Sequence, residues 1–189
     1  MKMSRARTCA AALAVGLTSL AGIAAFPGAA GAVPATATIG GGTLSMVSPT
    51  SVAFSANVTG VDQTVNSNNQ SFDVTDATGS GAGWNITATS TTFTDGTHTL
   101  ATNAVTQQAA PTRSCDASTT CTLAVTNVTY PYTLPAGATA PTATKLYNAT
   151  ASTGMGAQTS VGVMRLALPA SVFAGSYTST WTYSLVSGP

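Results

Sequence analysis

The chain has 189 residues, of which 6% are charged, and its six Lys and Arg against five Asp give a formal net charge of +1. Nucleic acids and anionic lipids require basic patches, so this composition disfavours both as partners. One His and five Asp, with no Glu, also leave few groups for acid–base catalysis.

Residues 1–32 have the three parts of an export signal. Lys2, Arg5 and Arg7 form a basic start, an apolar run rich in Ala and Gly follows, and Ala30-Gly31-Ala32 suits a signal peptidase. The apolar run is short for a membrane span, and no later stretch is longer. We therefore expect a cleaved signal peptide over 1–32 and secretion with no membrane insertion.

The mature chain of residues 33–189 is expected to form one domain. Its length suits a single core, and neither a linker nor a repeat divides it. Three Lys and Arg against five Asp leave a net charge of −2 in this part. A basic patch on the domain, which nucleic acids and anionic lipids would need, is therefore not expected.

The mature sequence predicts an all-β fold. Thr and Val, which favour strands, are abundant, whereas the usual helix formers are scarce. Short alternating runs are separated by Gly, Pro, Asn and Asp, as in antiparallel sandwiches and barrels. We expect a single antiparallel β-sandwich with Greek-key or Ig-like connections. Its strands are predicted near 43–48, 51–58, 70–75, 84–93, 98–103, 121–129, 160–168 and 176–187.

Three stretches carry more specific expectations. The sequence "TTFTDGTHTL" predicts a hairpin with a type I′ turn at Asp95-Gly96, because both central residues of that turn need positive φ. Over 160–169, alternation places Gly162, Met164, Leu166 and Leu168 on the core face. The three prolines of 131–159 favour a long loop or an edge segment there.

Cys115 and Cys121 are expected to form a disulfide. They are the two cysteines left after signal cleavage, and an even number in an exported chain favours a bridge. The alternative is part of a zinc site, which needs further ligands, and the only His is His98. We expect no bound metal and no cofactor.

Both tryptophans lie in strand-like runs of Thr with an aliphatic or aromatic residue on the same face. Trp84 shares its face with Ile86, and Trp181 shares its face with Tyr183 and Leu185, since i and i+2 point the same way along a strand. Burial in a sheet core is the first interpretation of these rings. The second is an exposed surface that stacks on sugar rings.

The motifs around these rings resemble the WxL domain of bacterial surface proteins. That family carries two Trp-x-Leu motifs, the first after an Asp and a Gly-rich turn and the second near the C-terminus. Here "VTDATGSGAGWNI" and "YSLVSGP" fit those two contexts. The chain departs from the pattern with Ile86 in place of Leu in the first motif and Tyr183 in place of Trp in the second. Trp181 lies two residues before that Tyr on the same face.

The resemblance implies non-covalent attachment to the Gram-positive cell wall, with peptidoglycan as the ligand. The motif residues Trp84, Ile86, Trp181, Tyr183 and Leu185 are then the candidate ligand-binding residues. Weaker candidates lie on the opposite faces of the same strands: Asn85, Thr87, Thr180 and Thr182. An alternative function is that of an accessory subunit that binds other cell-surface proteins. The third hypothesis, a glycan-acting enzyme, lacks a recognisable catalytic motif.

Overall fold

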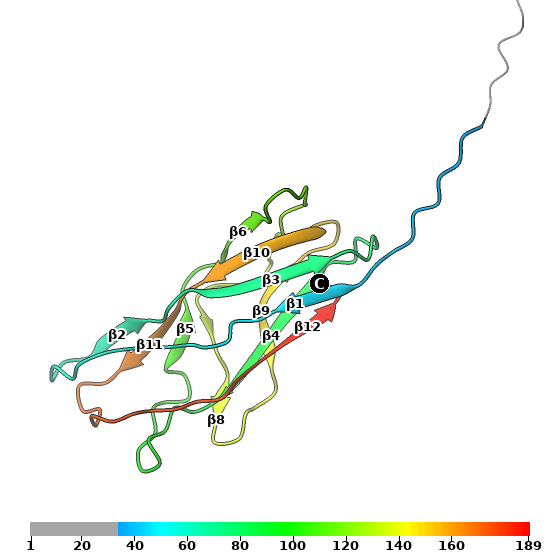
Figure 1. Ribbon diagram of the computed structural model, residues 1–189. Coiled ribbons are helices and arrows are strands. Elements are labelled where there is room, and N and C mark those ends of the chain that lie inside the picture. Colours follow the sequence, from blue (N-terminus) through cyan, green and yellow to red (C-terminus); the bar gives the residue numbers. More distant parts are fainter. Residues whose placement is uncertain (1–33) are drawn as a thin grey trace, which may run out of the picture. The chain divides into compact units, whose positions relative to one another are not determined.

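Twelve β-strands form the regular structure of residues 34–189, the part of the chain that the computed structural model describes (Figure 1). The expected signal peptide, 1–32, lies outside the described residues. The strands are β1 (Leu44–Val47), β2 (Gln63–Asn66), β3 (Gln70–Asp76), β4 (Trp84–Thr91), β5 (Val105–Gln107), β6 (Thr112–Cys115), β7 (Tyr132–Thr133), β8 (Ala136–Gly137), β9 (Thr144–Ala149), β10 (Gly156–Gly162), β11 (Met164–Leu168) and β12 (Trp181–Ser187).

The strands form three sheets that pack together, which confirms the predicted all-β fold of antiparallel strands. The first sheet has the order β1-β3-β10-β6 and the second the order β2-β11-β5-β7. The third has the order β12-β4-β8, and β9 also pairs with β4. All pairs are antiparallel except β4 with β8. Residues Ile39–Pro189 make up one compact unit, and no helix long and apolar enough to cross a membrane occurs in 34–189.

Two pairs of consecutive strands connect the first and second sheets. β10 and β11 are separated only by Val163, and β2 is followed closely by β3. The bend is held where the Ser67 amide donates to the Met164 carbonyl at 2.7 Å. Gly162 lies at this bend, and a Cβ there would approach Gln107 Nε2 to 3.0 Å. The core face predicted over 160–169 is confirmed, with Met164 buried.

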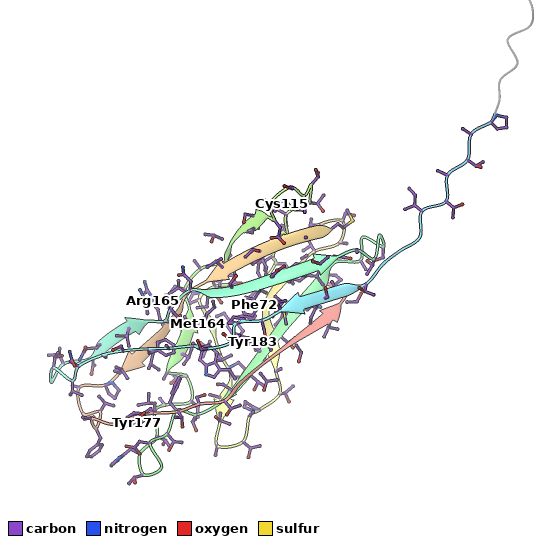
Figure 2. The ribbon with its side chains drawn as sticks, in the orientation of Figure 1. Phe72, Cys115, Met164, Arg165, Tyr177 and Tyr183 are labelled. Carbon is purple, nitrogen blue, oxygen red and sulfur yellow. A yellow bond between two sulfur atoms is a disulfide. The ribbon has the colours of Figure 1, made fainter. Side chains whose placement is uncertain are left out.

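The hydrophobic core includes side chains from all three sheets, among them Met164 and Leu166 of β11. The same buried cluster contains Phe72 of β3, Trp84 and Ile86 of β4, and Tyr147 of β9. All four side chains are at most 1% exposed. Figure 2 shows Phe72 near Tyr183, between the strands of the two sheets. Apolar residues at alternate strand positions therefore bury one face of each sheet.

Three of the predicted strands do not form. Residues 51–58 alternate in burial only as far as Ser55 and lack a strand partner, apart from Ala53, which exchanges hydrogen bonds with Asn68. Residues 98–103 contribute only an isolated bridge at Thr99, and 121–129 holds no strand. Alternation marks a face, but a strand also needs a neighbouring backbone in register.

Of the two alternatives expected over 131–159, the long loop is wrong and the edge segment is confirmed, since β7, β8 and β9 each pair with a single strand. This region contains β7, β8, β9 and the start of β10. β9 pairs with β4 in the third sheet, and its last four residues are all buried. The prolines precede Thr144, so they leave the amides of β9 free to donate to its neighbour.

The hairpin near residue 95 forms, but its turn is not type I′. A bridge joins Thr94 to Thr99, with a four-residue loop between them. Gly96 has a positive φ of 96°, whereas Asp95 is not among the residues with positive φ. The Asp95 carboxylate instead accepts the amides of Thr97 and His98 at 2.8 and 2.6 Å. These bonds favour the wider loop over the two-residue turn.

Candidate functional site

The two sequence motifs lie side by side on neighbouring strands. β4 carries Trp84 and Ile86, and β12 carries Tyr183 and Leu185. In the antiparallel register of this pair, Leu185 lies directly opposite Ile86. Motifs about a hundred residues apart in the chain are therefore one structural unit, formed by the edge strand β12 and its neighbour β4 in the third sheet (Figure 1).

Trp84 is fully enclosed by protein. Its indole is 0% exposed, and Nε1 donates a hydrogen bond of 3.0 Å to the Gly154 carbonyl. The ring packs edge-on to Tyr147 with centroids 5.7 Å apart. Gly154 has a φ of +75°, and a Cβ there would lie 2.6 Å from Trp84 Nε1. Trp84 and Ile86 therefore belong to the core, and this indole fixes the loop that precedes β10.

The rings of β12 connect the core to the surface. Trp181 and Tyr183 are both partly buried, with centroids 6.3 Å apart. Tyr183 packs edge-on to Phe72 at 5.0 Å, and Trp181 lies 6.4 Å from both Phe54 and Phe93. A chain of aromatic contacts therefore leads from the buried Phe72 to the partly buried Trp181. Edge and offset contacts of this kind add to the stabilisation from burial.

Tyr183 occupies the position where the second motif of the family has Trp. Its hydroxyl is buried and has no hydrogen-bond partner among the described residues. Burial disfavours the phenolate, so the pKa of Tyr183 is raised above its usual value of 10. The hydroxyl is closed off from solvent, and the exposed part of this side chain is its ring.

The opposite face of the motif strands is polar and partly open. Thr182 and Ser184 of β12 are exposed, and their cross-strand partners on β4 are Thr89 and Thr87. Thr89 is buried and donates to the Pro141 carbonyl at 2.7 Å. Asn85 is half-buried and its amide donates to the Gly188 carbonyl. Of the weaker candidates, Thr182 on β12 and Thr180 just before it are therefore exposed to solvent, Thr87 is half-buried, and Asn85 already bonds the backbone near the C-terminus.

Two adjoining hollows lie beside the loop of residues 169–177. Their volumes are about 670 and 740 Å³. Both are lined by Gln63, Leu100, Leu168, Val172, Phe173 and Tyr177. No Lys or Arg lines either hollow in the described part of the chain. The sequence interpretation did not include this surface; its one local signal was the pair of aromatic residues in "ASVFAGSY".

His98 borders this surface and is held from two sides. Its Nδ1 lies 3.0 Å from Asp95 Oδ2, and its ring stacks on Phe173 with centroids 3.9 Å apart. The backbone amide of His98, then its ring, and then the Thr97 amide lower the pKa of Asp95 from 3.8 to about 2. No Ser, Thr or Cys side chain of residues 34–189 hydrogen-bonds the His98 ring. The Asp–His pair therefore lacks the nucleophile of a catalytic triad.

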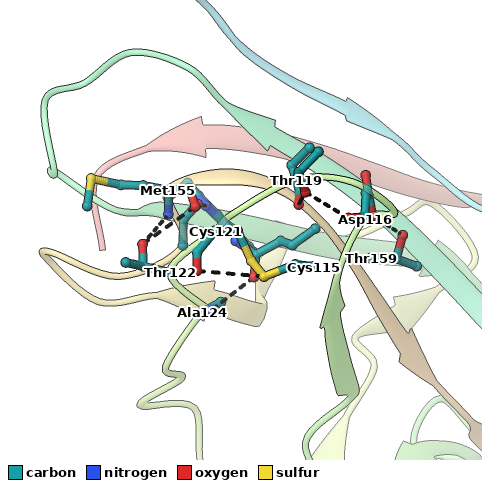
Figure 3. The surroundings of a disulfide bond; sticks show 12 residues. Cys115, Asp116, Thr119, Cys121, Thr122, Ala124, Met155 and Thr159 are labelled. Carbon is teal, nitrogen blue, oxygen red and sulfur yellow. Dashed lines mark hydrogen bonds between the residues drawn. A yellow bond between two sulfur atoms is a disulfide. The ribbon is translucent and has the colours of Figure 1, made fainter.

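The predicted disulfide is confirmed. Cys115 and Cys121 are bonded, with Cα atoms 5.6 Å apart (Figure 3). Beside the bridge, Asp116 Oδ1 accepts the Thr159 hydroxyl at 2.8 Å. The bridge closes the loop after β6 onto the end of that strand, and the Asp116 bond attaches the loop to β10. No group of three His, Cys, Asp or Glu side chains suited to a metal ion occurs in 34–189.

Packed antiparallel sheets with two paired aromatic–x–aliphatic motifs define the chain as an all-β domain built around these motifs. Comparison with family models matches the WxL domain, described as surface cell wall-binding, over residues 33–189. The chain belongs to this family, so the resemblance in the sequence is confirmed. Its association is with the cell wall. Comparison with curated proteins and with solved structures gives no match.

Proposed function

We propose that this domain attaches to the cell wall by binding the glycan of peptidoglycan directly and non-covalently. The observation that carries the proposal is the lack of cationic side chains around the two hollows. Anionic wall polymers such as teichoic acids carry phosphates, which are recognised by Lys and Arg. A neutral sugar chain needs only neutral hydrogen bonds and apolar contact, and this surface offers both.

We propose further that the domain acts without catalysis. Hydrolysis of a glycosidic bond commonly uses two carboxyl groups in one cleft. Here two Asp carboxylates accept hydrogen bonds from backbone or hydroxyl groups of the protein itself. Asp62 accepts the Ala170 amide at 2.8 Å, and Asp76 accepts the Thr78 hydroxyl at 2.7 Å. The first bond ties two distant loops together, and the second caps a local turn, so both are structural.

Sedimentation with insoluble peptidoglycan tests the proposal. The mature protein is mixed with peptidoglycan stripped of teichoic acid, and cellulose serves as the control polymer. We expect the protein to pellet with peptidoglycan, to saturate, and to release no soluble sugar. A protein that stays in solution with stripped peptidoglycan but pellets with intact walls would show that another wall polymer is the ligand. Release of reducing sugar would contradict the non-catalytic role.

A second candidate function is association with other cell-surface proteins. Leu123 and Val125 are 40% and 48% exposed, although Ala124 between them is fully buried. Exposed aliphatic residues on one face of an extended segment suit a protein contact. Immobilised mature protein would retain a surface protein in a pull-down, and Leu123→Ser with Val125→Ser would abolish that retention. Retention unchanged by these substitutions would contradict this role for the two residues.

A further inference from the structure

We propose that a neutral chain of N-acetylated sugars binds in the hollow around Phe173, with its sugar rings stacked on that side chain. The name Phe173 hollow refers to the surface shared by Phe173, Tyr177, Leu100 and Gln63. The inference rests on the proposed peptidoglycan binding and assigns it to a particular surface. This surface is distinct from the buried Trp84 of the first motif.

The side chain of Phe173 is exposed to solvent, although hydrogen bonds fix the loop that carries it. It is 60% exposed and is the one aromatic among the large exposed hydrophobic residues of 34–189. Burial of an aromatic ring stabilises a fold, and this ring forgoes that stabilisation. Exposed apolar surface beside polar groups is typical of a binding site.

Hydrogen bonds hold the loop that presents this ring. The Ala170 amide donates to Asp62 Oδ1 at 2.8 Å, and the Val172 amide donates to the Pro169 carbonyl at 3.0 Å. The Tyr177 hydroxyl donates to the carbonyl of Phe173 itself at 3.2 Å. Both ends of the loop are thereby fixed around Phe173. A ligand would meet a surface that needs little ordering on binding.

The Phe173 ring is also packed against protein on one face. His98 stacks on Phe173 with an angle of 17° between the ring planes, and Asp95 holds His98 through the 3.0 Å contact to Nδ1. Gly175 lies against the same carboxylate, since a Cβ there would be 3.2 Å from Asp95 Oδ2. One aromatic face is therefore occupied by protein. The exposed remainder of Phe173 is available to the C–H face of a sugar ring.

The polar side chains of the hollow match sugar hydroxyl and acetamido groups. Thr99 and Asn103 line it and can donate and accept hydrogen bonds, whereas Gln63, whose Nε2 already donates to Asn57 and Thr59, offers its Oε1 as an acceptor. The volumes of about 670 and 740 Å³ are within the range of small-molecule sites. Asp62 is the charged group in the lining, so phosphate-bearing and carboxylate-rich chains are disfavoured. These features select a neutral amino-sugar chain with apolar acetyl methyl groups.

The test compares Phe173→Ala with Val186→Ala. Val186 is also exposed, at 50%, but lies on the outward face of β12 away from the hollow. Each mature protein is checked for folding by circular dichroism and then titrated with a soluble tetramer of N-acetylglucosamine by NMR. Pelleting with stripped peptidoglycan is measured in parallel. We expect Phe173→Ala to weaken binding about tenfold, as the loss of one aromatic contact implies, and Val186→Ala to bind as the native protein does.

The outcomes separate this inference from the proposed function. If the native protein pellets and folded Phe173→Ala pellets equally well, the Phe173 hollow is not the site, although peptidoglycan binding stands. Equal losses in both variants would also overturn the inference. If the native protein neither pellets nor binds the tetramer, both the proposed function and this inference fail.

Discussion

Replacing Gly154 by Ala is predicted to destabilise the domain through its contact with the motif indole. A Cβ at this position would lie 2.3 Å from the Ala149 Cβ and 2.6 Å from Trp84 Nε1. The Gly154 carbonyl also accepts the hydrogen bond from Nε1. A side chain cannot enter here unless β9 or the indole moves, and both belong to the core.

The magnitude follows from two contributions. Gly154 has a φ of +75°, and an L-residue in that left-handed region costs about 1–2 kcal/mol. Forcing an extra methyl group into a packed core costs a further 1–3 kcal/mol, roughly. We therefore expect Gly154→Ala to lower the free energy of unfolding by about 2–5 kcal/mol.

Gly60 provides the matched control. Its φ is +77°, and a Cβ there would meet nothing within 4 Å. Gly60→Ala should therefore cost only the conformational contribution, about 1–2 kcal/mol. Urea unfolding followed by circular dichroism measures both variants. Equal losses in the two proteins would refute the reasoning, because they would show that the Trp84 contact adds nothing.

Two further predictions concern the disulfide and the Asp95 carboxylate. Replacing Cys115 and Cys121 together by Ser should cost about 2 kcal/mol, the loop-closure entropy of a short bridge, and an unchanged urea midpoint would contradict this. Because Asp95 has its pKa lowered from 3.8 to about 2 in the folded protein, its stabilisation is present above about pH 4 and lost as the pH falls toward 2. Asp95→Asn should therefore show a weaker loss of stability between these pH values, whereas an identical acid titration would count against the Asp95 bonds.

The sequence predicted the elements whose pattern is strictly local. Alternation over 160–168 located the core face of β10 and β11, and the motif around Trp84 located β4. The cysteine count alone predicted the Cys115–Cys121 bridge. In each case the deciding information, a period of two or a pair of thiols, lies within a few residues.

The strand predictions failed where pairing with a distant segment decides the structure. Residues 51–55 alternate in burial as β1 does, but no strand pairs with them as β3 pairs with β1. β9 follows a proline-rich stretch that left a long loop and an edge segment open, and its pairing with β4, which buries Tyr147, decides for the edge strand. Strand formation depends on partners that are distant in sequence, so propensity alone does not decide it.

The candidate surface was missed for a related reason. Phe173 and His98 come from segments about seventy-five residues apart, and each looks like an ordinary loop residue by itself. Only the fold brings their rings to 3.9 Å. The motif residues, by contrast, stand out in the sequence because they repeat. In the structure Trp84 and Ile86 are core residues, so a motif that is prominent in sequence need not be the part that touches the ligand.

The most direct test of this account is the sedimentation of Trp84→Phe with stripped peptidoglycan. Phe keeps an apolar ring in the core but loses the bond from Nε1 to Gly154, so the variant should be less stable yet still fold. Because the Trp84 side chain is 0% exposed, we expect the folded variant to pellet with the same saturation curve as the native protein. A folded Trp84→Phe protein that remains in the supernatant, while the native protein pellets, would show that the indole contacts the wall and would contradict the account.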